Sequence, residues 1–350
     1  MKIVLDDITC KEDLYPFTEI CSAVDIRIGI VTLREKWKLL GQEVTLSSET
    51  KEGEADLKNT KQIPANIIPS QELLSTLLRD DNFEPEEIKK RTIQYPWHIF
   101  QNNDWAIKED FELITKGRIS ENVSSTNKII GNDIFLEEGA AIKHCILNSS
   151  AGPIYIGKNA EVMEGSIIRG PFAMGEKSKL KMGSKVYAAT TLGPYCIGGG
   201  EIKNSVLFSY SNKSHDGYLG DSVIGEWCNL GAGTSNSNIK NTAGEVNIWN
   251  HFQQKYITAG LKCGLIMGDY SRSAINTSFN TGTVVGVACN IFSEGFPPNF
   301  IENFSWGSKK YDLEKALIHI DNWKKLKGRS ISQSEIKILS QIYHQTNNHA

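Results

Sequence analysis

The residues best suited to carry chemistry lie around His215, at the start of a glycine-rich stretch that runs from Ser214 to Thr234. An imidazole titrates near neutral pH, so a histidine can accept the proton of an amine as its nitrogen attacks a carbonyl carbon. Backbone N–H groups of a glycine-rich turn can stabilise the resulting oxyanion. An isolated histidine is usually an ordinary surface residue. Within the motif HDGYLGD, however, a functional role for His215 is the favoured interpretation. His215 is therefore the candidate general base for an acyl transfer.

The elements that would position His215 are indicated by apolar residues at every sixth position. These anchors are Ile130, Leu136 and Ile142, then Ile156, Val162, Ile168, Met174, Leu180, Val186 and Leu192, and then Tyr218, Ile224 and Leu230. Nine of the twelve anchors other than Tyr218 are followed four residues later by a small residue: Ala140, Ala160, Ser166, Ser178, Ser184, Thr190, Cys196, Cys228 and Thr234. A period of six fits neither an α-helix nor an alternating strand. It is typical of hexapeptide β-helices.

In such a β-helix, each group of six residues forms one flat side of a triangular coil, and the anchors stack inside it. Small residues and glycines fit close to the corners, where glycine allows a tight backbone without a steric cost. Each coil hydrogen-bonds to its neighbours, so stability grows with the number of stacked repeats. A glycine-rich β-sandwich with accidental spacing is the alternative for the same residues.

The sequence predicts three parts: a small α/β domain over residues 1–115, the β-helix over 116–300 and helices over 301–350. In the first part we expect strands and helices at Lys2–Leu5, Ile28–Val31, Leu33–Leu40, Gln71–Arg79 and Trp105–Ile114. Asn241–Gly260 leaves the repeat and predicts an extended excursion or hairpin, and Gly295–Pro298 is expected to end the coil. A helix from Leu313 to Trp323 and a second one after the capping box at Ser332 would cap the open end of the β-helix.

Composition excludes several classes of protein. The 350 residues carry 38 basic and 41 acidic side chains, and the net charge of −3 argues against a nucleic-acid partner. No apolar stretch approaches the roughly 18 residues of a membrane span, and the N-terminal MKIVLDDITC does not resemble a signal peptide. The seven cysteines form no CxxC pair, which favours reduced thiols and a cytoplasmic protein.

The residues around His215 resemble a known family. The segments HDGYLGD at 215–221, Ile224-Gly225 and NLGAGT at 229–234 are similar to the acetyltransferase half of bacterial GlmU enzymes, over about residues 130–295. Those enzymes N-acetylate glucosamine 1-phosphate and then attach UMP. The resemblance implies a left-handed parallel β-helix that forms a homotrimer and uses acetyl-CoA as a cosubstrate. It also implies a divergent GlmU-like branch with a shortened N-terminal, nucleotidyltransferase-like part.

The resemblance assigns roles to individual residues. His215 matches the general base, Lys203 and Tyr218 match residues that bind the sugar phosphate, and Asn229 matches a residue that contacts the sugar. The resemblance gives the acetyl-CoA site three residues: Ala232, Gly233 and, after the insertion, Lys255. Asn238 matches the first residue of an NYDG motif, in which Ile239 replaces the tyrosine. Lys185 replaces a phosphate-binding arginine, so it keeps the charge but loses the bidentate fork.

The N-terminal part departs from the nucleotidyltransferase pattern, because its first glycine is Gly29 and the glycine-rich phosphate loop is missing. A structural or regulatory remnant is therefore an alternative to a nucleotide-binding domain. Arg27, Arg34 and Lys36 are candidates for phosphate contacts in this part. Near the C-terminus, the basic residues either meet the 3′-phosphate of coenzyme A or form a solvated helix face: Lys324, Lys325, Lys327 and Arg329.

Three functions remain open from the sequence. The first is an acyl-CoA-dependent N-acyltransferase, acting on an amino-sugar phosphate or a nucleotide sugar, without a metal. The second is a sugar-1-phosphate nucleotidyltransferase that requires Mg²⁺. The third is a non-catalytic β-helix that binds a sugar nucleotide. In each case the expected partners are small molecules and other copies of the chain.

Overall fold

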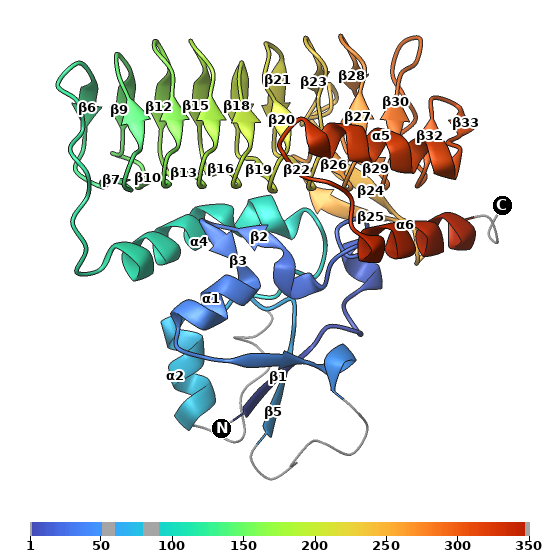
Figure 1. Cartoon of the computed structure of the whole chain (residues 1–350), viewed down its shortest axis with the longest axis horizontal. Coiled ribbons are helices and arrows are strands. Elements are labelled where there is room, and N and C mark those ends of the chain that lie inside the picture. The colour runs from blue at the N-terminus through green and yellow to red at the C-terminus, as the bar shows by residue number, and fades with distance from the viewer. Residues whose placement is uncertain (1, 51–59, 80–90, 347–350) are drawn as a thin grey trace.

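The computed structural model describes residues 2–50, 60–79 and 91–346. A parallel β-helix runs along one side of the molecule, and a smaller α/β domain lies beneath it (Figure 1). Two helices at the C-terminal end lie beside the last coils. The predicted fold class, mainly β with a parallel β-helix, a small α/β domain and C-terminal helices, is confirmed.

The β-helix has three faces, which we name by their largest sheets. The nine-stranded face contains β7 (Ile134–Leu136), β10 (Ile154–Ile156), β13 (Phe172–Met174), β16 (Thr190–Leu192), β19 (Val206–Leu207), β22 (Val223–Ile224), β26 (Ile266–Met267), β29 (Val284–Val285) and β31 (Phe300–Ile301). The six-stranded face contains β6 (Lys128–Ile130), β9 (Ile146–Asn148), β12 (Ile167–Arg169), β15 (Lys185–Tyr187), β18 (Glu201–Lys203) and β21 (Tyr218–Gly220), and β23 (Ser235–Asn236) and β28 (Ser278–Phe279) extend it.

The third face is the five-stranded face. It contains β8 (Ala141–Ile142), β11 (Glu161–Val162), β14 (Lys179–Leu180), β17 (Ile197–Gly198) and β20 (Asn212–Lys213), and it continues through Asn229 into β27 (Arg272–Ser273), β30 (Asn290–Ile291), β32 (Ser305–Trp306) and β33 (Lys309–Lys310). Each coil passes from the nine-stranded face to the five-stranded face and then to the six-stranded face.

The anchors fill the interior of the coil, with two exceptions. Leu136 and the anchors from Ile156 to Leu192 are at most 2% exposed. Tyr218 is only half-buried, and its neighbour Leu219 occupies the inward row opposite Ile202. Ile130 is 42% exposed, because Ile129 holds the inward position opposite Leu147. Both errors arise because inward residues are not always six apart: Ile129 and Leu136 are seven apart, and the coil from Ile202 to Leu219 has seventeen residues, so a strict period of six drifts out of register.

The excursion and the end of the coil were predicted with different success. Residues 241–260 leave the coil as expected, and β24 (Val246–Asn250) and β25 (Lys255–Gly260) form an antiparallel hairpin. The prediction that Gly295–Pro298 ends the coil is wrong. β31 pairs with β29 and β32 pairs with β30 beyond that loop, so the coil continues for most of another turn.

The C-terminal helices are α5 (Leu313–Lys325) and α6 (Gln333–Thr346). The predicted capping box is present: the Glu335 N–H donates to Ser332 Oγ, and the Ser332 N–H donates to Glu335 Oε2. The helices pack along the flank of the coil rather than across its open end. Their apolar residues meet a corner of the coil that carries Trp227, Tyr270, Ala288 and Phe304.

The α/β domain is built on a parallel sheet of β4 (Val44–Leu46), β1 (Lys2–Asp6) and β5 (Thr60–Pro64), with α1 (Leu33–Leu39) and α2 (Gln71–Arg79). The predicted strand at Ile28–Val31 is instead a turn between β2 (Arg27–Ile28) and β3 (Val31–Thr32), where Gly29 has a φ of +72°. The predicted connecting helix is longer than expected and forms α4 (His98–Thr115).

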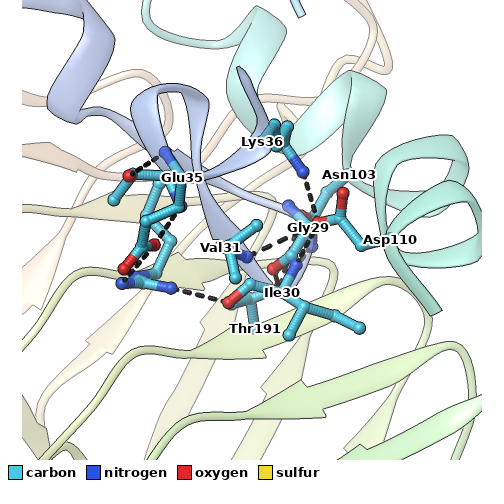
Figure 2. A network of polar contacts seen from close by, with 10 residues as sticks. Gly29, Ile30, Val31, Glu35, Lys36, Asn103, Asp110 and Thr191 are labelled. Atoms are coloured by element: carbon cyan, nitrogen blue, oxygen red, sulfur yellow. Dashed lines mark hydrogen bonds and ion pairs between the residues drawn. The ribbon is translucent and has the colours of Figure 1, made fainter. Parts of the chain in front are cut away.

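The α/β domain docks on the outer side of the nine-stranded face. The outward residues Val206, Val223 and Ile266 are fully buried within the core of this domain. Polar contacts of α4 reinforce the junction, as Figure 2 shows. Asn103 accepts the Gly29 N–H at 2.7 Å and donates to the Ala189 carbonyl at 2.7 Å.

Asp110 of α4 completes this network with a buried ion pair. One carboxylate oxygen accepts the Ile30 N–H at 2.7 Å and also binds the ammonium of Lys36 (Figure 2). The side chains of Lys36 and Asp110 are only 2% and 4% exposed. Removing one partner would leave the other charge buried and uncompensated, so the pair stabilises the packing of α4 against α1 and the turn between β2 and β3 within the α/β domain.

Candidate active site

His215 lies at the corner where the chain passes from the five-stranded face to the six-stranded face. β20 ends at Lys213 and β21 begins at Tyr218, and the imidazole between them is exposed. The turn requires glycine at Gly217, which has a φ of +119° and where a Cβ atom would lie 2.1 Å from the Thr234 carbonyl oxygen. The corner therefore presents His215 to solvent on a closely packed backbone.

Ala232 and Gly233 occupy the same corner in the next coil. The Gly233 N–H donates to the Asp216 carbonyl at 3.1 Å, so it is used to join the coils. Within the described residues the Ala232 N–H has no hydrogen-bond acceptor. The sequence-predicted general base and one N–H able to stabilise an oxyanion thus lie on adjacent coils of one corner.

Lys213 is a component of this corner that the sequence analysis missed. Its side chain points into the coil and is 1% exposed, and its ammonium donates to the carbonyls of Gly199, at 3.3 Å, and of His215. Burial lowers the pKa of Lys213 to about 8. A lysine at an inward position of an otherwise apolar repeat was the signal that could have identified it.

A polar cluster on the six-stranded face joins three of the predicted residues. Asp221, which is 3% exposed, accepts a hydrogen bond from Asn238 Nδ2 and forms an ion pair with Lys203 Nζ at 3.6 Å. Asn238 also donates to Tyr218 Oη at 3.1 Å. Burial and the nearby Asp221 carboxylate raise the pKa of Tyr218. Asp221 was missed as a site residue, although it closes the motif HDGYLGD.

Further cations lie on the same face. Lys185 is exposed and pairs in register with Glu201, which in turn pairs with Tyr218. Beside this row, Arg169, Lys203 and Lys262 line a groove of about 610 Å³. Arg169 and Lys262 were not predicted, because their proximity depends on the stacking of distant coils. The face can therefore bind an anionic group such as a phosphate.

Two predicted residues lie elsewhere. Asn229 belongs to the five-stranded face, where its Oδ1 accepts a hydrogen bond from Asn212 Nδ2 at 3.4 Å. Lys255 is exposed at the start of β25, and within the described residues it has no contact with the corner of His215. A single chain therefore does not bring Asn229 or Lys255 to Lys203 and Tyr218.

Most of the other candidate phosphate ligands are bound within the chain. Lys36 pairs with Asp110, Arg34 makes two hydrogen bonds to Asp25, and Arg27 donates to the Ile30 carbonyl at 2.6 Å. Near the C-terminus the partners are Glu335 for Lys324, Asp321 for Lys325, and the Tyr195 carbonyl for Lys327. Lys36, Arg27 and Lys324 are buried with these partners, whereas Arg34 and Lys325 form pairs that stay exposed to solvent. In the described residues, no group of three or more His, Cys, Asp or Glu side chains could hold a metal ion.

Comparisons with known proteins agree with the resemblance. A family described as sugar nucleotidyl transferase matches residues 41–119. The chain is 29% identical over 218 residues to the bifunctional protein GlmU of Methanocaldococcus jannaschii, covering 62% of this chain and 47% of that protein. It is 32% identical over 202 residues to a bifunctional sugar-1-phosphate nucleotidylyltransferase/acetyltransferase of Sulfurisphaera tokodaii, covering 56% of this chain and 43% of that protein. The chain is a divergent relative of GlmU proteins.

The chain spans about half the length of the curated relatives it matches. A crystal structure of a hexapeptide transferase family protein from Anaplasma phagocytophilum shares 14% identity with this chain, covers 65% of this chain and 92% of that chain, and has a TM-score of 0.19. Separately, no helix in the described ranges has the length and apolarity needed to cross a membrane.

Proposed function

We propose that the chain is an acyl-CoA-dependent N-acyltransferase that acts on an amino-sugar phosphate or nucleotide sugar, with acetyl as the transferred group. The observation that carries the proposal is the corner of His215. There an exposed imidazole lies on the coil next to the free N–H of Ala232, at the start of the six-stranded face whose far edge carries Lys203. The divergent relationship to bifunctional nucleotidyltransferase/acetyltransferases supports the same class of reaction.

The proposed reaction assigns a role to each group at this corner and on the six-stranded face. The amine nitrogen of the sugar attacks the thioester carbonyl carbon, a C–N bond forms and the C–S bond breaks. His215 accepts the proton of the amine and returns it to the leaving thiolate. The Ala232 N–H stabilises the oxyanion, and Lys203 and Lys185 bind the phosphate of the acceptor. Asn229 and Lys255 would join the site from a neighbouring copy in a homotrimer.

A thiol-release assay tests this proposal. Acetyl-CoA with glucosamine 1-phosphate, followed by a panel of amino-sugar phosphates and nucleotide-linked amino sugars, should release free coenzyme A. His215→Ala should abolish release while the thermal unfolding curve and oligomeric state stay unchanged. If no amino sugar in the panel releases thiol above the rate without enzyme, the proposal is wrong.

Sugar-1-phosphate nucleotidyl transfer is a second candidate, because the sugar nucleotidyl transferase family matches residues 41–119. It would require Mg²⁺ and would release pyrophosphate from UTP or dTTP. The burial of Arg27 and Lys36 against internal partners weighs against it, since these two cations are not accessible to a nucleotide. Pyrophosphate release with a sugar 1-phosphate would favour it. A non-catalytic sugar-nucleotide-binding β-helix would instead bind UDP-sugars without product formation.

A further inference from the structure

A second groove lies on the six-stranded side, beyond the polar cluster of Asp221. It has a volume of about 730 Å³ and is formed by the segment 237–242, the hairpin β24–β25, the residues after β28 and the loop before β31. Ser237 and Ile239 line this groove. Asn238 lies between them and hydrogen-bonds to Tyr218 and Asp221, so the groove adjoins the candidate active site.

The polar lining of the groove is dominated by side-chain amides. Four asparagines contribute from four separate segments: Asn241, Asn247, Asn280 and Asn299. Asn247 Oδ1 accepts from Thr258 at 3.0 Å and Asn280 Oδ1 accepts from the Thr281 N–H at 2.8 Å, which leaves both amide NH₂ groups directed to solvent or ligand. An amide both donates and accepts hydrogen bonds, and so does a hydroxyl group.

Apolar side chains lie exposed in the same groove. Tyr256 is 62% exposed and Phe296 is 64% exposed, and they come from the hairpin and from the loop before β31. Large apolar surfaces that gather at a hollow mark sites that a partner or ligand covers. The C–H face of a sugar ring is an apolar surface of suitable size, and its rim carries the hydroxyl groups that amides bind.

The charge of the groove separates it from the groove that holds Lys203. Lys240 is its only charged lining residue among the described residues, and no carboxylate lines it. By contrast, the groove of Lys203 is lined by five charged residues, the basic Arg169, Lys203 and Lys262 and the acidic Asp104 and Asp221. A phosphate would therefore bind at Lys203, and a neutral, hydroxyl-rich ring is the better match for the asparagine groove.

We propose that the asparagine groove binds an uncharged sugar ring, and that the acceptor is therefore a saccharide of two or more rings. The neutral ring occupies this groove and the charged end lies at Lys203. The second half of this inference rests on the proposed acyltransferase function, whereas binding of the neutral ring does not.

Binding without acyl-CoA tests the first half. The probes are three neutral disaccharides, N,N′-diacetylchitobiose, cellobiose and lactose, with glucose as the single-ring control, titrated into the full chain by calorimetry and ligand-observed NMR. At least one disaccharide should bind more tightly than glucose. Asn280→Ala and Phe296→Ala should each weaken that binding about tenfold, which corresponds to the loss of one good contact. Asn132→Ala, at an exposed asparagine of the first coil, should leave it unchanged.

The outcomes separate the two proposals. If none of the disaccharides binds, or if Asn280→Ala and Phe296→Ala both bind like the wild type, the groove inference is wrong. His215→Ala should retain disaccharide binding whether or not the chain transfers acyl groups. A wild-type chain that binds a disaccharide but releases no thiol with any amino sugar would overturn only the proposed function.

Discussion

The nine-stranded and six-stranded faces belong to the same coils but treat their outer surfaces in opposite ways. On the nine-stranded face the outward residues Val206, Val223 and Ile266 are apolar and buried under the α/β domain. On the six-stranded face the outward residues Lys185, Lys203 and Tyr218 are polar, and grooves lie beside them. The inward residues of both faces form the buried core of the coil. The two faces therefore differ in their outward residues, which determine whether a face docks another domain or is open to solvent.

This difference separates the residues that stabilise the protein from the residues proposed to act on a substrate. Docking on the nine-stranded face depends on buried surface and on Asn103, which donates to the Ala189 carbonyl, and the docked domain itself is stabilised by the buried pair of Asp110 and Lys36. The corner of His215 and the six-stranded face carry exposed side chains that the coil does not need. Substitutions on the two faces should therefore change different measured quantities.

The largest effect is expected at the exposed corner. His215→Ala should lower the rate of thiol release by about 10²- to 10⁴-fold, the usual contribution of a general base, with no change in the free energy of unfolding. His144→Ala is the matched control, because His144 is exposed at the same corner of an earlier coil and accepts the Gly165 N–H through its carbonyl. Equal rates for the two variants would show that His215 does not act as the base.

The next effect belongs to the docked face. Asp110→Asn should lower the free energy of unfolding by about 3–5 kcal/mol, because Lys36 would remain buried without its counter-charge. Asp104→Asn on the same helix is the control. Its carboxylate forms an exposed pair with Lys108 at 2.6 Å, and the loss should stay below about 1 kcal/mol. Urea unfolding monitored by circular dichroism measures both. Similar values for the two variants would contradict a structural role for the buried pair.

A smaller effect is expected on the six-stranded face. Lys203→Met should raise the KM for glucosamine 1-phosphate about tenfold and leave kcat nearly unchanged, since a charge-assisted hydrogen bond to phosphate is worth about 1.5–3 kcal/mol. Lys179→Met is the control, because Lys179 pairs with Glu161 on the five-stranded face. Steady-state kinetics distinguishes the two variants. An unchanged KM for Lys203→Met would contradict the proposal that Lys203 binds the phosphate.

The sequence predicted the inside of the coil better than its outside. The period of six follows from the inward stacking of residues such as Leu180 and Val186, and this pattern is visible in one chain. It failed at Ile130 and Tyr218, where the spacing of the inward residues departs from six and the register shifts by one residue. The flank position of α5 also escaped prediction, because it depends on a row of corner residues that are far apart in the sequence.

The candidate site was predicted in part for the same reason. Lys203, Tyr218 and Asn238 come together around Asp221, and His215 lies at the corner that precedes Tyr218. Arg169 and Lys262 join them only because distant coils stack. Asn229 and Lys255 lie apart from this cluster within one chain. The sequence pattern of a single chain does not show which residues a neighbouring copy would bring to the site.

Lys213 gives the smallest and most specific test of the corner. Burial lowers its pKa to about 8, whereas an unfolded lysine titrates near 10.4. Between these values the unfolded chain holds a proton that the folded chain lacks, so this group makes stability rise with pH from about 8 to about 10.4. Lys213→Met should remove that rise relative to the wild type, while Lys179→Met should keep it. Urea midpoints measured at half-unit steps across this range test the prediction. Parallel curves for the wild type and Lys213→Met would mean that the ammonium is not buried beneath His215. Lys213 would then not be the residue that holds the His215 carbonyl in place.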